Sequence, residues 1–400
     1  MKGKICSGAA LLSGSILVGA CGGVVDRGES EGESGVQASA HRARVPKAKI
    51  ERLRVEGDPF LHRTGHQVVA VKDDIFVLRG VEDDIATQTN TFRDDLFRLD
   101  PKRHRRVRMT ERRERSASPP STAFHCTVGD DRRGGSLLSF GGAHFLFQGD
   151  PAFFQSFAVF DTLWRYRVSD ERWQAIEPVG ARPTPRAGCN AEFYRGSMYM
   201  FGGLSRVFAL NNELWRFDTS TERWTQLTPS GPVPEARFIG ATTVDDDGGD
   251  IYLFNGHRST SIGFQTIGDF WVYHVATNRF RQLPSIPAAA RDEGTLSILR
   301  APGGKKYVVH TAGHTASSVL CTGFAERTTA IDEIWAFDLS TEIWQKLDVV
   351  GHAPRIEFVR GATVDNQHYL IGGWADVPDP VNTCRQEWSE DVYRLSLVNP

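Results

Sequence analysis

The chain has 400 residues, of which 40% are apolar and 24% are charged, and its formal net charge is −2. This composition describes a globular protein with enough chain for a large core, and it provides no overall basic field that would recommend nucleic acid as a partner. The 39 glycines, 24 phenylalanines and nine tryptophans favour many short strands joined by tight turns over long helices, so an all-β fold is predicted.

The first twenty residues have the pattern of an export signal. Lys2 and Lys4 precede the stretch "ICSGAALLSGSILVGA", which is too short and too often interrupted by Gly and Ser to span a membrane comfortably as a mature helix. It ends in Val18-Gly19-Ala20-Cys21, which resembles a bacterial lipobox. The resemblance implies a mature chain that starts with a lipid-bearing Cys21, and Gly22 in place of Asp favours the outer membrane or the cell surface. An ordinary cleaved signal is the alternative.

The next segment is predicted to be a flexible tether. Residues 22–46, "GGVVDRGESEGESGVQASAHRARVP", contain few large apolar side chains and many Gly, Ser and Glu. We therefore divide the chain into a signal peptide at residues 1–20, a tether at residues 21–46 and a folded domain at residues 47–400.

A sequence pattern recurs six times in the folded domain. The copy "NNELWRFDTSTERWTQL" (residues 211–227) has five relatives, and the shared aromatic residues are Phe97, Trp164, Trp215, Trp271, Trp335 and Tyr393. They are 67, 51, 56, 64 and 58 residues apart, and we number the copies repeats 1 to 6. Repetition at this period indicates one supersecondary unit packed against copies of itself.

Each repeat predicts four short strands. The second strand ends in a pair of small residues, which is Gly-Gly in repeats 2, 3 and 6 and Arg79-Gly80, Asn255-Gly256 and Ala312-Gly313 in the others. The shared aromatic lies in the third strand, and in four copies a second aromatic follows nine residues later in the fourth: Trp173, Trp224, Phe280 and Trp344. Because Gly adopts positive φ readily, the pair lets the second strand leave its sheet where backbones crowd together.

A Gly pair followed by an aromatic and then by Trp at a fixed distance resembles the kelch repeat, and the resemblance covers residues 47–400. It implies a six-bladed β-propeller with one four-stranded antiparallel sheet per repeat, in which the aromatics fill the wedge between neighbouring blades. In such a propeller the loops into the first strand and the loops after the Gly pair emerge on one face, where ligands are expected.

An N-terminal strand is predicted to complete the last blade, because repeat 6 has no fourth strand of its own. Ile50-x-x-Leu53 copies the Trp-x-x-Leu pattern that fourth strands show at residues 224–227. We therefore expect a strand at about residues 49–54 to pair with residues near 391–396, which would close the ring and remove an exposed sheet edge.

Arginine recurs at the entry of the first strand in five of the six repeats: Arg63, Arg186, Arg237, Arg291 and Arg355, with Pro120 in repeat 2. A partial ring of guanidinium groups can bind a carboxylate or phosphate in bidentate fashion, so these are candidate ligand-binding residues and suit an acidic partner. The alternative is a structural role, in which each Arg bonds to carbonyl groups or acidic side chains of the propeller itself.

Further candidate ligand contacts follow the small pairs: His144, His257, His314 and Trp374. Three imidazoles raise the possibility of a metal site. Repeats 2, 4 and 5 are not all neighbours, however, so their histidines are not expected to converge on one ion. We predict solvated or ligand-contacting side chains, no metal and no cofactor.

Signatures of catalysis are sparse. The sequence contains no HExxH, no Gly-x-Ser-x-Gly and no P-loop, and the copper site of galactose-oxidase-type kelch enzymes is not found. A carbohydrate-active enzyme of the sugar mutarotase type is kept as the alternative, because that chemistry needs only a general acid or base and an Arg for the sugar carboxylate. Glu357 and Arg360, with Arg355 nearby, are the candidates.

Four cysteines follow Cys21, and an even number in an exported protein suggests disulfides. Cys126 and Cys189 lie in predicted first strands of adjacent repeats, whereas Cys321 and Cys384 lie in long loops of adjacent repeats. Of the three possible connectivities we favour Cys126–Cys189 with Cys321–Cys384.

We predict a lipid-anchored extracytoplasmic recognition module that binds an envelope protein or glycan through its ligand face. The loop "GGAHFLFQGDPAFFQSFAVF", with six Phe between Phe145 and Phe160, is either an exposed contact patch or a plug folded over the channel mouth. The basic run from Lys102 to Arg115 is either a solvated strand and loop or a contact for anionic lipid or polysaccharide.

Overall fold

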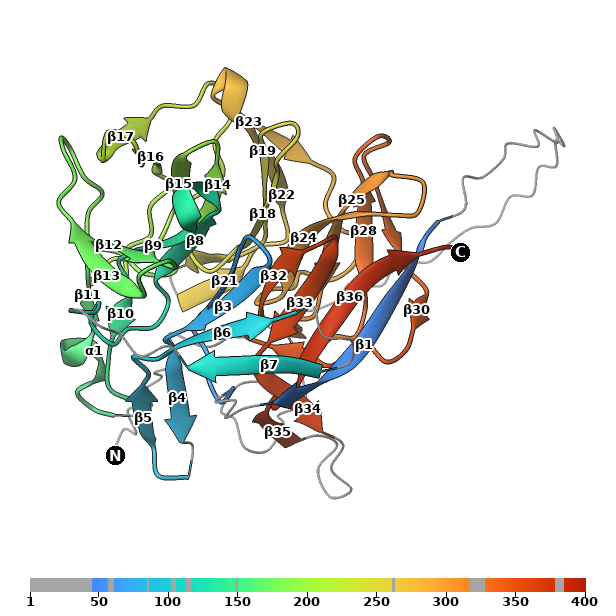
Figure 1. Ribbon diagram of the computed structural model, residues 1–400, viewed down its shortest axis with the longest axis horizontal. Coiled ribbons are helices and arrows are strands. Elements are labelled where there is room, and N and C mark those ends of the chain that lie inside the picture. The colour runs from blue at the N-terminus through green and yellow to red at the C-terminus, as the bar shows by residue number, and fades with distance from the viewer. Residues whose placement is uncertain are drawn as a thin grey trace, which may run out of the picture.

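The computed structural model describes residues 45–56, 61–84, 86–101, 106–111, 117–147, 150–260, 263–316, 328–377 and 385–400. These residues form a β-propeller, with short antiparallel sheets standing around a central axis (Figure 1). Within these ranges the helices are one short α-helix, α1 (Phe153–Ser156), and two 3₁₀ turns, η1 (Arg132–Gly134) and η2 (Val275–Thr277). None of the helices in the described ranges has the length and hydropathy to cross a membrane.

Repeats 2 to 5 each form a separate four-stranded antiparallel sheet whose first strand lines the central channel. The strands of repeat 2 are β8 (Cys126–Asp130), β9 (Ser136–Phe140), β12 (Leu163–Arg167) and β13 (Arg172–Ile176), and those of repeat 3 are β14 (Asn190–Tyr194), β15 (Ser197–Phe201), β16 (Leu214–Asp218) and β17 (Arg223–Leu227). Those of repeat 4 are β18 (Ala241–Asp245), β19 (Asp250–Phe254), β22 (Phe270–His274) and β23 (Arg279–Leu283), and those of repeat 5 are β24 (Thr295–Arg300), β25 (Lys306–Thr311), β28 (Trp335–Asp338) and β29 (Ile343–Lys346).

Repeats 1 and 6 are joined into one larger sheet by β1 (Lys47–Glu56). Repeat 1 contributes β2 (Gln67–Val71), β3 (Asp74–Leu78), β6 (Leu96–Asp100) and β7 (Arg106–Glu111), and repeat 6 contributes β32 (Arg360–Val364), β33 (Gln367–Ile371) and β36 (Val392–Val398). β1 pairs with β36, then with β7, and also with the short β30 (Val349–Val350). The six repeats therefore give five large sheets instead of six separate ones, because β1 hydrogen-bonds to the first and the last repeat at once.

The predicted closure by an N-terminal strand is confirmed. β1, blue in Figure 1, lies antiparallel beside β36, red, from Lys47 opposite Val398 to Leu53 opposite Val392. Ile50 and Leu53 are an odd number of residues apart and therefore face opposite sides of the strand. Ile50 packs into the core between repeats 5 and 6, and Leu53 packs into the core between repeats 6 and 1. A single strand thus fills two inter-repeat wedges.

The small pairs connect each repeat to the next. The N–H of the second residue donates to a carbonyl of the following repeat over 2.8–3.3 Å: Gly80 to Thr122, Gly142 to Arg186, Gly203 to Arg237, Gly313 to Ile356 and Gly373 to Arg63. In repeat 4 the Asn255 side-chain amide donates to the Arg291 carbonyl at 2.7 Å instead. A Cβ on Gly313, whose φ is +88°, would lie 2.2 Å from the Asp292 carbonyl oxygen, so only Gly fits there.

Hairpins that follow the small pairs project from one face, which we call the rim. They are β4 (Val81–Asp84) with β5 (Thr89–Phe92), β10 (Ala143–His144) with β11 (Ala158–Val159), β20 (His257–Thr260) with β21 (Gly263–Thr266), β26 (His314–Ala316) with β27 (Thr328–Ala330), and β34 (Trp374–Val377) with β35 (Arg385–Trp388) and β31 (Ile356–Glu357). The β4–β5 and β34–β35 hairpins extend from the same side of the molecule in Figure 1.

A disulfide joins Cys126 to Cys189, with 5.7 Å between their Cα atoms, as the sequence predicted. It links the start of the first strand of repeat 2 to the residue that precedes the first strand of repeat 3, and both cysteines line the channel. Cys21, Cys321 and Cys384 lie outside the described residues, as does most of the basic run beyond β7.

Candidate functional site

Four of the predicted arginines are buried within their own repeats. Arg63, Arg186, Arg237 and Arg291 are between 0% and 3% exposed, and they pair with Asp95, Glu213, Asp269 and Glu333 at 2.5, 2.6, 2.6 and 3.2 Å. Arg237 illustrates the geometry: its two Nη atoms donate to the two carboxylate oxygens of Asp269, and Nη1 also donates to the Asn255 carbonyl at 3.0 Å. Burial and pairing of this kind favour the structural role that the sequence left open as the alternative.

The same carboxylates also hold the repeated tryptophans. Each acid lies two residues before the shared aromatic, and its oxygen accepts a hydrogen bond from the indole Nε1 of Trp215, Trp271 or Trp335 at 2.6–3.0 Å. In repeat 2 the Arg position is held by Thr122 and not by Pro120, as expected from the sequence, because Gly80 donates to the Thr122 carbonyl; Thr162 holds the acid position. Base and acid are therefore absent together in that repeat, which is the pattern expected of a structural pair.

Arg355 does not occupy the repeated position. That position in repeat 6 is held by Ile356, whose carbonyl accepts the cross-repeat bond from Gly313. The Arg355 side chain is 53% exposed. The acid of this repeat, Asp391, instead accepts a hydrogen bond at 2.7 Å from Arg52 of β1, so the closing strand supplies the missing base.

The histidine predictions need correction, because only one of the three is solvated. His257 and His314 begin rim hairpins and are 3% and 1% exposed, and Trp374 is also buried at 4%. His144 lies one residue beyond the equivalent position, which Ala143 occupies. Its exposed ring stacks on Phe92 with 4.2 Å between centroids.

The structure brings His257 and His314 together through Asp292, which the sequence reasoning had overlooked. His257 Nε2 lies 3.1 Å from one Asp292 oxygen, and His314 Nε2 lies 2.7 Å from the other. His314 Nδ1 in turn lies 2.8 Å from Glu357 Oε2. This buried chain of ion pairs runs from repeat 4 through repeat 5 to repeat 6. In the sequence, the one sign of this arrangement is that Asp292 directly follows the repeated Arg291. In the other repeats the recurring Arg is not followed by an acidic residue.

The charges in this chain stabilise one another. Burial opposes protonation of His314, but Asp292 and Glu357 outweigh it and hold the pKa of His314 well above its ordinary value. Burial likewise disfavours the Asp292 carboxylate, yet His314 and His257 lower its pKa. Glu293 lies 3.7 Å from His257, and burial raises its pKa. The ion pairs therefore stabilise the contacts between repeats 4, 5 and 6.

The proposed acid–base pair for sugar chemistry is not assembled. Glu357 is 0% exposed and is occupied by His314 and by the amide of Gln386, whereas Arg355 pairs with Asp332 at 3.6 Å. Arg360 makes no contact with Glu357 and instead lines the channel. Among the described residues, no group of three or more His, Cys, Asp or Glu is arranged to hold a metal ion.

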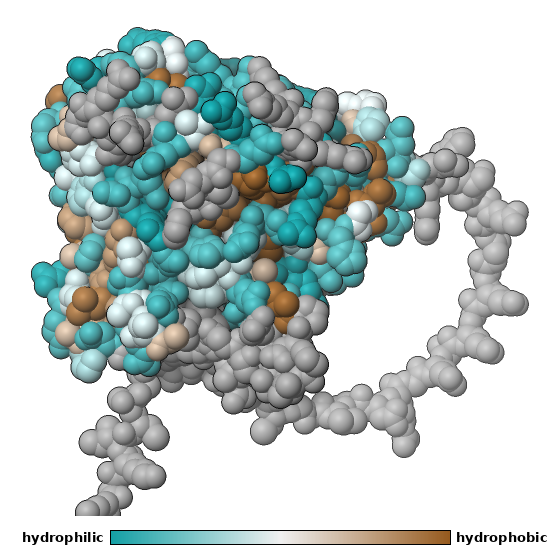
Figure 2. Space-filling model, turned by 60° about the horizontal axis from the view of Figure 1, so that its bottom comes forward, coloured by the Kyte–Doolittle hydropathy of each residue, from teal (hydrophilic) through white to brown (hydrophobic). Residues whose placement is uncertain are grey.

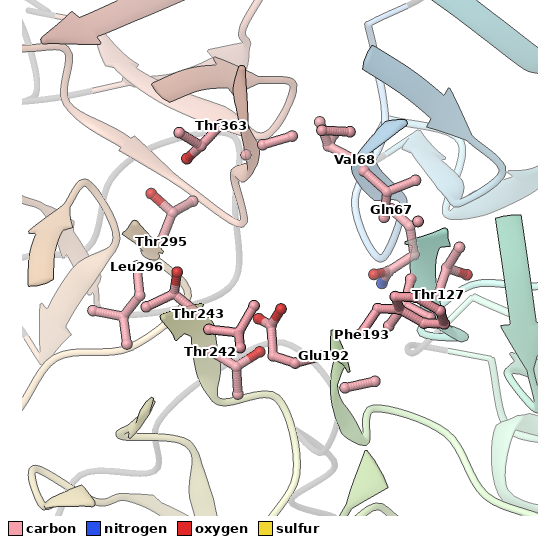
Figure 3. Close-up of a pocket in the computed structure, with 18 of the residues that line it drawn as sticks. Gln67, Val68, Thr127, Glu192, Phe193, Thr242, Thr243, Thr295, Leu296 and Thr363 are labelled. Atoms are coloured by element: carbon pink, nitrogen blue, oxygen red, sulfur yellow. The ribbon is translucent and has the colours of Figure 1, made fainter. Parts of the chain in front are cut away.

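The central channel contains a cavity of about 730 Å³ lined by the first strands of all six repeats. Figure 3 shows threonine side chains, among them Thr127, Thr243 and Thr363, placed around this space together with Glu192. Burial raises the pKa of Glu192 to about 7, although Thr242 donates a hydrogen bond that opposes the shift. The cavity is thus lined mainly by polar groups.

An apolar cluster lies at the rim end of this channel. Phe145, Phe153 and Phe157 from the repeat 2 insertion are buried in one cluster with Phe124 and Ile239, both of which also line the cavity. Half of the phenylalanines in the insertion are therefore buried, and we call Phe145, Phe153 and Phe157 the plug.

Other side chains of the insertion reach the surface. Phe154 is 43% and Leu146 40% exposed, and Val207 from the neighbouring loop of repeat 3 is 80% exposed. Phe208 packs behind them against Phe154, with ring centroids 5.5 Å apart. We call Leu146, Phe154 and Val207 the apolar ridge. Figure 2, with the rim side turned forward, shows hydrophobic patches among predominantly hydrophilic residues.

This arrangement of Gly pairs, paired aromatics and radial sheets defines a kelch-type β-propeller, a fold that suggests a protein-binding module. The chain belongs to the KLHDC2/KLHL20/DRC7 kelch-repeats domain family, whose profile matches residues 18–247, 65–309 and 133–373. It is 24% identical over 343 residues to Kelch domain-containing protein 10 of Xenopus tropicalis, covering 84% of this chain and 76% of that protein. It is 25% identical over 340 residues to the leucine-zipper-like transcriptional regulator 1 homolog of Drosophila melanogaster, covering 84% of this chain and 31% of that protein.

Proposed function

We propose that this protein is a recognition module that binds a protein partner on the rim, and that a lipid on Cys21 anchors it to the outer membrane of a bacterial envelope, on the periplasmic side or at the cell surface. The observation that carries the binding proposal is the apolar ridge, whose three side chains are between 40% and 80% exposed above the buried plug. An exposed apolar group that rests on a rigid support commonly marks a contact surface.

The ridge is well supported for binding. Phe153, Phe157 and Phe208 pack beneath it, with ring centroids between 4.6 and 6.3 Å apart. A partner would therefore meet a surface that is already ordered, which lowers the entropy cost of association. Glu357 is sealed inside the fold, so we do not carry the mutarotase alternative forward.

The binding proposal can be tested by cross-linking and affinity capture from an envelope fraction, with a glycan array run in parallel. The double variant Phe154→Ser/Val207→Asp should lose the captured protein. The matched control is Ile343→Ser, because Ile343 is a 54% exposed apolar residue on the outer strand β29, remote from the rim in its repeat. Capture that survives the ridge variant, or binding to glycans alone, would count against a protein partner at the ridge.

The anchoring proposal rests on Val18-Gly19-Ala20-Cys21 and on the polar segment that follows. Metabolic labelling with a radioactive fatty acid should mark the wild type and not Cys21→Ser, and Cys21→Ser should leave the membrane fraction. An unlabelled wild-type protein would refute the lipid anchor without affecting the ridge proposal.

A further inference from the structure

The guanidinium group of Arg360 lies in the central channel and has no ion pair with a described carboxylate, unlike the buried arginines of the repeated position. Arg360 is the first residue of β32 and lines the cavity, so its partly accessible nitrogens face the internal space. Its one hydrogen bond is from Nη1 to the neighbouring Val359 carbonyl at 3.0 Å. Arg63 and Arg237, by contrast, each hold a carboxylate at 2.5–2.6 Å.

Within the described chain, no carboxylate makes an ion pair with Arg360. The acidic group that acts on it electrostatically is Glu293. Glu293 is 2% exposed, and its carboxylate pairs with His257 and not with Arg360. Burial raises the pKa of Glu293, which disfavours its charged form. Burial lowers the pKa of Arg360, because a guanidinium that lacks a counter-ion is less stable away from bulk water. The fold therefore leaves a charge to be neutralised at this place.

Another unpartnered polar group lies at the same end of the channel. His125 immediately precedes β8, just as Arg360 begins β32, so both lie at the rim end of the inner strands. His125 is 2% exposed and lines the cavity, yet neither of its ring nitrogens has a hydrogen-bond partner. Buried polar atoms without partners are uncommon in proteins and call for an explanation such as a bound ion or water.

The electrostatics at this end favour an anion over a cation. Burial and Arg79 lower the pKa of His125 to about 3, so its imidazole is neutral and presents one N–H donor. Burial, Arg63 and Arg360 lower the pKa of His66 in the same way. The neighbourhood thus contains excess positive charge and neutral donors. Because each inner strand is the edge of its sheet, unpaired backbone N–H groups can also face the cavity.

We propose that Arg360 binds a small anion, a halide or a carboxylate, at the rim end of the channel cavity, where His125 provides a neutral donor. The anion supplies the counter-charge that this guanidinium lacks within the protein. Phe145, Phe153 and Phe157 are buried in an apolar cluster at the rim end, so we expect the anion to enter from the opposite mouth. This site is independent of protein binding at the ridge.

The test is a bromide titration of the full-length protein, followed by the 81Br NMR line width at constant sodium concentration. The wild type should show saturable broadening, and Arg360→Gln should weaken this binding at least tenfold. Arg300→Gln is the matched control, because Arg300 lines the same cavity but its guanidinium is paired with Asp247. Acetate is titrated as a competitor: displacement of bromide assigns a site that also accepts carboxylates, and no displacement assigns a halide site.

Equal broadening in the wild type and Arg360→Gln, or broadening that never saturates, would overturn the proposal. If Arg360→Gln does not fold, bromide-soaked crystals of the wild-type protein decide the question. An anomalous peak within hydrogen-bonding distance of Arg360 supports the site, and a featureless channel refutes it.

Discussion

Replacing the two buried anchors of β1 should remove a large part of the stability of the propeller. Ile50 is 3% exposed and Leu53 is 1% exposed, and they pack into two different inter-repeat cores on opposite faces of the strand. Truncation of a buried Ile or Leu to Ala costs about 2–5 kcal/mol. Because the two sites share no cluster, the costs should add, and Ile50→Ala/Leu53→Ala should lose about 4–10 kcal/mol.

This loss is comparable to the whole free energy of unfolding of a typical domain, which is about 5–15 kcal/mol. Urea unfolding followed by Trp fluorescence measures it, and Arg54→Ala is the control, because Arg54 is an exposed residue of the same strand. Deletion of residues 47–55 should be more severe than deletion of residues 21–46, since only the former removes the pairing with β36. A double-variant loss below about 1 kcal/mol, close to that of Arg54→Ala, would refute the view that β1 closes the ring.

Three further outcomes follow from buried interactions. Arg237→Met should cost about 3–5 kcal/mol in urea unfolding, because it leaves Asp269 with an uncompensated charge, and Arg237→Met/Asp269→Asn should recover part of that loss. Reduction of the Cys126–Cys189 disulfide should cost about 2–5 kcal/mol and lower the Tm, whereas an unchanged Tm after verified reduction would argue against a structural disulfide. The raised pKa of His314 means that its contribution to stability is fully present below about pH 6.5 and is lost as pH rises through the folded-state pKa. His314→Gln should therefore flatten the dependence of unfolding free energy on pH above about 6.5, and an unchanged slope would show that His314 is not the titrating group.

The repeat architecture was predictable because its signals are local. Gly-Gly at 202–203 and the aromatics at Trp215 and Trp224 lie within one short stretch of chain, and each follows from a backbone or packing requirement inside a single repeat or at its boundary. The closing strand was predictable for the same reason, since Ile50 and Leu53 reproduce the spacing of the missing fourth strand. The number of separate sheets was not predictable from the sequence. It depends on the pairing of β1 with both repeat 1 and repeat 6, which is visible only in the assembled ring.

The candidate site was predicted less well, because its properties depend on contacts between distant residues. A recurring Arg can bind a ligand, or it can pair with an acidic side chain of the protein itself, and the sequence does not distinguish the two roles. The structure favours the second role, because the arginines pair with acids that lie 27 to 42 residues away in the chain: Asp95, Glu213, Asp269 and Glu333. His257 and His314 were expected at the surface, but the rim hairpins bury them against Asp292.

The sequence alone therefore determined the kelch repeat, the β-propeller class and the strand that closes it, because strand periodicity, positive φ and aromatic wedges are encoded within tens of residues. Only the tertiary structure decided which charges are satisfied inside the protein and which are not. Arg237 and Arg360 are both arginines beside a first strand, yet one meets Asp269 and the other faces the channel without an ion pair to a described carboxylate. That difference arises from how the repeats pack around the axis, since burial and charge compensation are properties of the assembled ring.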